Sequence, residues 1–484
     1  MNFLNITPGV MHILPEIIIL TFALLTIVIE PFTKLKKLIG VLGIFVLALA
    51  LTVLVISAYR GVRIESLFYG MLASDQFGIF FRAISIITSG IVILLSMGYA
   101  GLPKDSEGEY YSMLLFITVG MMLLASSSNL LMIFLAIEFV SITSYILAGF
   151  MKSEPRSSEA ALKYFLLGGL SSGVMLYGMS LLYGWTKSLD IMEIYTALNS
   201  GNIPLPLIIV SVTFLLAGFG FKIALVPFHM WTPDVYEGAP TPVAAFLSVG
   251  PKAAGFAVLI RVLLVGMGGD IQIHWVPILA GLSILTMTIG NIVAIAQQNI
   301  KRLIAYSSIA HSGYILLGLV LSNRLGLEGI LLYLLIYLFM NLGAFGVVIV
   351  VSNSIKSDEI KDYAGLSQRS PLLALALAVF LVSLSGIPPT AGFVGKFYIF
   401  AACIEGGYAW LAVIAIINSI IAAYYYFKIV RVMYLVEAKD RGVIRGEIGS
   451  GIALFVTLAL TIIIGVYPGP FISLVERSIH ILGM

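Results

Sequence analysis

The chain has 484 residues, of which 60% are hydrophobic and only 11% are charged, and its mean hydropathy is +1.07. Soluble globular proteins carry roughly 25% charged residues, so this composition is typical of a polytopic membrane protein. The net charge of +3 excludes the strongly basic surface that a nucleic-acid-binding protein needs. The single cysteine, Cys403, excludes an internal disulfide and any cysteine-ligated iron–sulfur or zinc site.

Neither the N-terminus nor the histidines show a recognisable functional motif. The N-terminus, MNFLNITPGVMHILPE, lacks the basic region of a cleavable signal peptide, so the first apolar run is expected to remain as a helix. The five histidines, at positions 12, 229, 274, 311 and 480, show no metal-ligand spacing. The sequence therefore predicts no metal site.

Runs of about 20 apolar residues mark transmembrane helices, and the sequence predicts an all-α polytopic membrane protein with about fourteen of them in a single membrane domain. Their approximate ranges are 12–31, 38–58, 75–99, 109–126, 129–150, 158–184, 203–226, 240–264, 275–296, 302–322, 326–352, 371–403, 408–434 and 451–474. The connections are short, and none could form a soluble domain. The segment 371–403 is too long for one span and is interrupted by SGIPPTAG, from Ser385 to Gly392.

Basic residues in the connections predict the orientation in the membrane, because they are enriched on the cytoplasmic side. The odd-numbered connections hold sixteen of the 27 lysines and arginines. The even-numbered connections and the C-terminus hold six: Arg60, Arg63, Lys187, Arg261, Arg324 and Arg477. We therefore expect a multi-pass protein of the inner (plasma) membrane with both termini on the periplasmic side.

Five basic residues remain inside the predicted helices: Arg82, Lys163, Lys222, Lys252 and Lys396. A charge at the centre of a membrane helix costs about 2.5–3.5 kcal/mol on insertion scales, so such residues are candidates for function. Among the acidic residues, only Glu138 falls deep in a predicted span. Arg82 lies near the start of its span, and we expect it to anchor helices or lipid.

Glu138 lies mid-helix in the fifth span, and Lys163 lies near the start of the sixth. A short connection makes these two helices antiparallel neighbours, so the two side chains are expected to pair. The pair could be a salt bridge that fixes helix packing. It could also be a switch, because the proton affinity of a lysine changes with burial and with a nearby carboxylate.

Two further lysines flank a proline-rich turn. Lys222 precedes Pro227 by five residues, and proline prevents an unbroken helix and frees a backbone carbonyl. Such breaks are tolerated at membrane depth where they line a hydrated cavity, although the side chain of Lys222 could instead reach the interface. Lys252 lies about twelve residues into the eighth span, which is too deep to reach an interface easily.

Lys396 follows the second break, SGIPPTAGFVGK. Two interrupted helices in corresponding halves, each with a lysine nearby, indicate an ion pathway built on inverted repeats. The predicted layout is an N-terminal part (1–108), two five-helix repeats (109–264 and 275–434) and a C-terminal part (435–484). His229 and His311 are the histidines nearest this line; each could relay protons or be a hydrogen-bonded packing residue.

Four stretches carry a resemblance to a known family. They are FKIALVPFHMWTPDVYEGAPTPVAAFLSVGPKAAG, QQNIKRLIAYSSIAHSGY, YLFMNLGAFGVV and GIPPTAGFVGKFYIF. Together they resemble the antiporter-like membrane subunits of respiratory complex I, NADH-quinone oxidoreductase. The variant VYEGAPTPV, and lysine rather than glutamate at 396, are similar to the subunit N branch of that family.

This resemblance implies two inverted five-helix repeats with discontinuous helices 7 and 12. Glu138 and Lys163 match the family's glutamate–lysine pair in the fifth and sixth helices. Lys222, Lys252 and Lys396 match its lysines in the seventh, eighth and twelfth helices. The chain would then translocate protons in the membrane arm beside other membrane subunits, while NADH, FMN, the iron–sulfur clusters and quinone would be bound by other subunits.

Three hypotheses of function follow. The first is a proton-translocating subunit of NADH-quinone oxidoreductase that holds no cofactor itself. The second is a cation/proton antiporter subunit without redox coupling, which the buried lysines alone would not distinguish from the first. The third is a passive scaffold between neighbouring subunits, which leaves the buried lysines unexplained.

Overall fold

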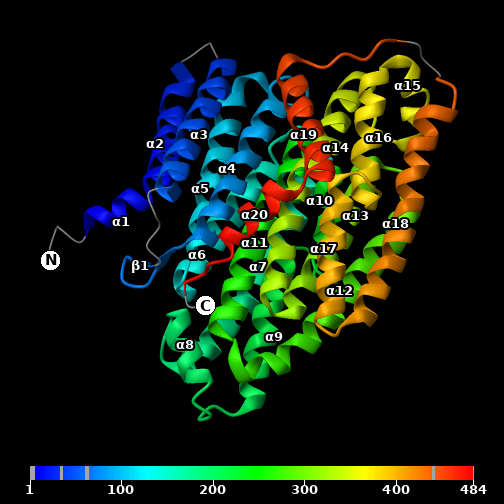
Figure 1. Cartoon of the computed structure of the whole chain (residues 1–484). Helices are drawn as coiled ribbons and strands as arrows, with labels where there is room; N and C mark the ends of the chain where they lie inside the picture. Colours follow the sequence, from blue (N-terminus) through cyan, green and yellow to red (C-terminus); the bar gives the residue numbers. More distant parts are fainter. Residues whose placement is uncertain (1–5, 33–35, 60–64, 439–441, 483–484) are drawn as a thin grey trace.

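The computed structural model describes residues 6–32, 36–59, 65–438 and 442–482, and these are almost entirely helical (Figure 1). The helices are α1 Ile6–His12, α2 Leu14–Ile29, α3 Lys36–Tyr59, α4 Gln76–Ser96, α5 Glu107–Ser126, α6 Leu130–Ala148, α7 Pro155–Thr186, α8 Ile191–Leu198, α9 Leu205–Lys222, α10 Trp231–Gly238, α11 Thr241–Ile260, α12 Gln272–Ile295, α13 Ile300–Leu321, α14 Arg324–Ile355, α15 Leu366–Arg369, α16 Pro371–Ser385, α17 Ala391–Glu405, α18 Ala409–Leu435, α19 Ile448–Val466 and α20 Gly469–Ser478. Two short strands, β1 Glu65–Leu67 and β2 Leu72–Ser74, form an antiparallel hairpin in which Leu67 pairs with Leu72.

The prediction of an all-α polytopic membrane protein is confirmed. Thirteen helical segments in the described part of the chain are long and apolar enough to cross a membrane. The remaining predicted span, 371–403, consists of α16 and α17, which have 15 residues each. At 1.5 Å per residue, neither helix alone crosses a hydrocarbon core of about 30 Å, so together they form one broken span.

Three helices, α11, α13 and α14, form the centre of the bundle. The α14 sequence is apolar around its whole circumference, which is the pattern of a helix surrounded by other helices. The N-terminal helices α2 and α3 lie at one edge of the bundle, and α18 lies at the other (Figure 1). These outer helices expose many large apolar side chains, as membrane-facing helices do.

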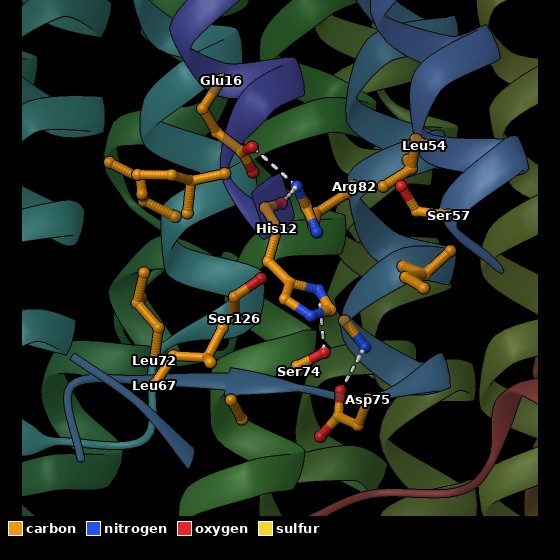
Figure 2. Close-up of a pocket in the computed structure, with 15 residues that line it drawn as sticks. His12, Glu16, Leu54, Ser57, Leu67, Leu72, Ser74, Asp75, Arg82 and Ser126 are labelled. Carbon is orange, nitrogen blue, oxygen red and sulfur yellow. Dashed lines mark hydrogen bonds and ion pairs between the residues drawn. The ribbon is translucent and has the colours of Figure 1, made fainter. Parts of the chain in front are cut away.

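The N-terminal helices are held to the bundle by a buried arginine. Arg82 of α4 donates hydrogen bonds to the Glu16 carboxylate, at 2.6 Å, and to the backbone carbonyl of His12, at 2.7 Å (Figure 2). Ser74, at the end of β2, contacts the His12 ring at 3.1 Å. Arg82 therefore anchors α2 to α4, as expected from its place near a helix start.

One residue that we assigned to a connection lies in the core instead. Arg261 follows α11 in a single π-helical turn, and its guanidinium binds Asp75 through bonds of 2.7 and 3.1 Å. Both side chains are essentially inaccessible to solvent. Arg261 therefore carries no information about the orientation of the chain in the membrane. Of the other basic residues assigned to the even-numbered connections, Arg60 and Arg63 lie outside the described residues.

Candidate functional site

The first helix break directly follows Lys222. Pro227 cannot donate a backbone hydrogen bond, and the chain leaves the helical path between α9 and α10. The break is stabilised locally: the carbonyl of Phe221 accepts a 3.0 Å hydrogen bond from the indole of Trp231 in addition to a 3.1 Å bond from the backbone of Ala224. Lys222 is thereby fixed at the open end of α9, inside the bundle.

Lys222 has no carboxylate in ion-pair contact within the described chain. Its side chain is only 3% exposed, and its ammonium donates a 3.1 Å hydrogen bond to the hydroxyl of Ser141 on α6. Glu138, one turn before Ser141, lies within electrostatic range. Lys222 and Glu138 therefore influence each other without forming a salt bridge.

Glu138 lies at the outer side of α6 and is partly exposed rather than deeply buried. Its carboxylate accepts a short hydrogen bond from Ser172 of α7. The predicted pair with Lys163 does not form in the structure. Side chains lean toward the N-terminus of their own helix, and α6 and α7 run antiparallel, so Lys163 leans toward the connection at 149–154 while Glu138 leans away from it.

Lys163 instead belongs to a cluster of charges at that end of the bundle. Its ammonium contacts Asp234 of α10 at 2.7 Å and Glu159 of its own helix at 2.8 Å. Arg302 of α13 bridges Asp234 and Glu237 at 2.7 and 2.9 Å. These side chains line an open cleft of about 250 Å³.

Asp234 is the centre of this cluster and binds both cations. Partial burial opposes its ionisation, but hydrogen bonds from Lys163 and Arg302 hold the pKa of its carboxyl below the usual range. Since α10 directly follows the first break, these ion pairs fix the position of α10 against α7 and α13.

Lys252 lies in the middle of α11, a helix in which every residue is buried, and only 3% of Lys252 is exposed. Its ammonium donates hydrogen bonds to the hydroxyl and carbonyl of Ser308, at 2.6 and 3.0 Å, and to the hydroxyl of Ser312, at 3.3 Å. All three acceptors are neutral and belong to α13. Within the described chain, this lysine also has no acidic ion-pair partner.

His311 of α13 lies between two of the lysines. Its ring contacts the hydroxyls of Tyr333, at 2.8 Å, and Tyr426, at 3.2 Å. Both Lys252 and Lys396 lie close enough to His311 for their charges to interact electrostatically with its ring. Helix α13 therefore connects the two lysines through its serines and His311.

Lys396 occupies the second break. Gly386, at φ +85°, ends α16 in a left-handed conformation that glycine adopts at no steric cost. The carbonyl of Ser385 is freed at this helix end and accepts a 3.0 Å hydrogen bond from the Lys396 ammonium. On its other side, this ammonium lies 4.7 Å from the centre of the Tyr314 ring, a cation–π contact.

His229 stands apart from these residues. It lies in the turn between α9 and α10 against the backbone of Pro227. Within the described chain, no hydrogen bond or ion pair links it to Glu138 or to any of the four lysines. Of the two candidate histidines, His311 is the one that contacts the chain of polar groups.

The polar partners of Lys252 on α13 were not predicted, although the sequence contains a signal for them. The α13 segment SSIAHSGY places Ser307, Ser308 and Ser312 on a membrane helix, and these hydroxyls now surround Lys252 and Tyr426. The contacts of Asp234 with Lys163 and with Arg302 were not predicted, because these residues are distant in sequence. In the described chain, no group of three His, Cys, Asp or Glu side chains is arranged to hold a metal ion.

Comparison with known proteins identifies the family. Residues 127–422 match the family model described as NADH:quinone oxidoreductase/Mrp antiporter, TM. NADH-quinone oxidoreductase subunit N 2 of Chloroherpeton thalassium is 43% identical, over 98% of this chain and 95% of that protein.

Solved structures agree with this relationship. A chain of respiratory complex I from Thermus thermophilus with bound aureothin superposes with a TM-score of 0.80 at 33% identity, covering 95% of this chain and 98% of that one. A chain of the Mrp complex from Dietzia sp. DQ12-45-1b has a TM-score of 0.86 but only 21% identity over 97% of this chain and 96% of its own, which shows a shared fold alone. The chain belongs to the NADH-quinone oxidoreductase subunit N family.

Proposed function

We propose that this chain is a proton-translocating subunit in the membrane arm of NADH-quinone oxidoreductase. The observation that carries the proposal is the chemistry around Lys222, Lys252 and Lys396. All three ammonium groups are buried among serine hydroxyls and backbone carbonyls. A lysine in such surroundings can release and regain a proton, because no bound carboxylate holds its charge.

The proposed path begins at Glu138 and Lys222, continues through Lys252 and His311, and ends at Lys396. Quinone reduction elsewhere in the complex would drive the movement. Lys163, within its cluster of charges, would set the position of α10 beside the first break. His229 is the weaker relay candidate, because its contacts are confined to its own turn.

The layout of the chain belongs to the same proposal. A lysine adjoins a broken helix at Lys222 and again at Lys396, which supports two inverted repeats at 109–264 and 275–434. We propose that both termini face the periplasm, on the distribution of basic residues. NADH, FMN, the iron–sulfur clusters and quinone would be bound by other subunits, and this chain would supply proton movement alone.

The test is the variant Lys396→Met in the assembled complex, reconstituted in liposomes. Methionine fills similar space without an ionisable group, so quinone reduction should persist while fewer protons move per electron pair. Lys187→Gln, at an exposed helix end, is the matched control and should behave as wild type.

Full proton pumping in both Lys396→Met and Lys222→Met would support a scaffold instead. Proton movement that follows an imposed cation gradient without NADH oxidation would support an antiporter.

A further inference from the structure

A second, larger cleft opens beside α11 on the face that carries the Lys163 cluster. It has a volume of about 640 Å³ and lies between the turn after α4, the start of α11 and the segment that follows α14. Polar and charged residues line it, among them Asp358. This face is the one that we propose to be cytoplasmic.

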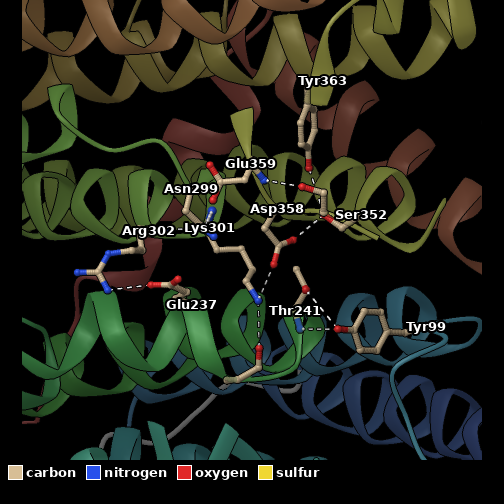
Figure 3. Close-up of polar contacts among 12 residues, drawn as sticks. Tyr99, Glu237, Thr241, Asn299, Lys301, Arg302, Ser352, Asp358, Glu359 and Tyr363 are labelled. Carbon is tan, nitrogen blue, oxygen red and sulfur yellow. Dashed lines mark hydrogen bonds and ion pairs between the residues drawn. The ribbon is translucent and has the colours of Figure 1, made fainter. Parts of the chain in front are cut away.

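Behind Asp358 lies another buried lysine. Lys301, at the start of α13, is 5% exposed. Its ammonium contacts the Asp358 carboxylate at 3.1 Å and the backbone carbonyl of Ala239 at 3.4 Å (Figure 3). Asp358 is 27% exposed and also accepts a 2.7 Å hydrogen bond from Ser352. One carboxylate thus separates the open cleft from Lys301.

The residues inward of Lys301 lead toward Lys252. Ser308, which binds Lys252, follows Lys301 by two turns on the same face of α13, about 10.5 Å along the axis. Helix α10 lies alongside this part of α13. Ala239, at the end of α10, contacts Lys301, and Tyr236, three residues earlier, lies beside Ser308. The interval between the two lysines is therefore bounded by α10 and α13.

Polar atoms without partners gather along this interval. The hydroxyls of Tyr236 and Tyr337 lie beside Ser308, and the Asn341 side chain binds Ser248 of α11 through its nitrogen. Both hydroxyls and the Asn341 carbonyl oxygen are buried without a hydrogen-bond partner among the described residues. Buried polar groups are rarely left unpaired, and ordered water is the usual partner.

We propose that Lys301 is an additional proton-transfer residue, with Asp358 as its gate, through which protons from the cleft reach Lys252. This inference rests on the proposed function. The Lys301 ammonium gives one proton to the water and hydroxyl chain beside Tyr236 and Tyr337, and the resulting amine takes one proton from water in the cleft. The Asp358 carboxylate holds the ammonium between transfers and faces the cleft, so it controls access.

The decisive variant is Lys301→Arg in the purified complex. Arginine keeps the positive charge and the pairing with Asp358, but it does not release a proton near neutral pH. Proton translocation should slow by about a hundredfold or more, the scale of losing one acid–base group, while assembly and uncoupled quinone reduction persist. Lys361→Gln, at an exposed lysine outside the lining of the cleft, should pump as wild type.

Wild-type pumping by Lys301→Arg would overturn the proposal and leave Lys301 as a structural cation. Where that variant fails to assemble, the double variant Tyr236→Phe/Tyr337→Phe decides, because it removes two unpartnered hydroxyls and preserves packing. Slowed pumping supports the water chain, and unchanged pumping overturns it. Lys252→Met, measured in parallel, distinguishes failure of the Lys301 proposal from failure of the proposed function. Full pumping by Lys252→Met would refute the proposed function itself.

Discussion

At the scale of single residues, the buried cations fall into two chemical groups. Arg82 and Arg261 each bind a carboxylate, and arginine stays protonated in proteins. Lys222, Lys252 and Lys396 bind neutral oxygens instead. Arginine with an acid suits a fixed structural link, whereas lysine among neutral groups suits reversible protonation. The choice of residue thus separates structural charges from candidate transfer sites.

Asp75→Asn tests the structural group. Asp75 accepts bonds from Arg261, from the backbone of Gly78 and from the backbone of Leu482 near the C-terminus. Breaking a buried ion pair by removing one partner costs about 3–5 kcal/mol. Thermal unfolding of the purified complex should show this subunit's transition at a lower temperature. The exposed Asp270→Asn should leave the transition unchanged, and an equal shift in both variants would contradict the argument.

Glu138→Gln tests the charge nearest Lys222. The glutamine carbonyl can still accept the hydrogen bond from Ser172, so helix packing should be preserved. The charge whose field reaches Lys222 is lost, and pumping should slow by about tenfold, the effect of a one-unit change in the proton affinity of Lys222, while the complex assembles. Proton uptake in liposomes is the measurement, with Glu193→Gln as the control, because the exposed Glu193 also accepts a hydrogen bond from a serine, Ser188. Normal pumping by Glu138→Gln would remove Glu138 from the path.

At the scale of elements, the two broken helices hold the lysines in place. In each break, a side chain donates a hydrogen bond to a carbonyl near the helix end: Trp231 binds Phe221, and Lys396 itself binds the free carbonyl of Ser385. The second break therefore ties the position of its lysine to the local backbone. A change in the break should move the ammonium.

Gly386→Ala tests this coupling. A left-handed conformation costs a non-glycine residue roughly 1–2 kcal/mol, and the added Cβ would lie 2.7 Å from Cδ of Lys396. Gly407 has nearly the same φ, +81°, but has no neighbour within 4 Å of an added Cβ. Both variants should lose similar stability, but only Gly386→Ala should lower the protons pumped per electron pair. Equal pumping ratios in the two variants would refute the coupling.

How much of this could be predicted differs between elements. Long apolar runs predicted the membrane-spanning helices. Glycine and proline near Pro227 and in SGIPPTAG predicted the two helix breaks. The short helices α8 and α10 were not predicted, because eight residues are too few for a clear periodicity. The Asp234 and Asp75 ion pairs were also missed, since contacts between residues distant in sequence leave no local pattern.

At the scale of the whole molecule, polarity decreases from the centre outward. The central helices α11, α13 and α14 carry Lys252, Lys301 and His311, while the outer helices α3, α7 and α18 present apolar side chains. A buried polar axis inside an apolar shell is the arrangement that a membrane protein needs to hold water and charge away from lipid. The exposed apolar shell is suited to lipid and to neighbouring membrane subunits.

The orientation of this axis can be measured directly. With Cys403→Ser as background, single cysteines are placed at the exposed positions Lys361, after α14, and Asn202, before α9. The positive-inside distribution predicts that Lys361→Cys reacts with an impermeant maleimide only from the cytoplasmic side, and Asn202→Cys only from the periplasmic side. The Cys403→Ser chain alone should not react from either side. The reverse labelling pattern would place the cleft at Asp358 on the periplasmic side, and uptake of cytoplasmic protons through it would then be excluded.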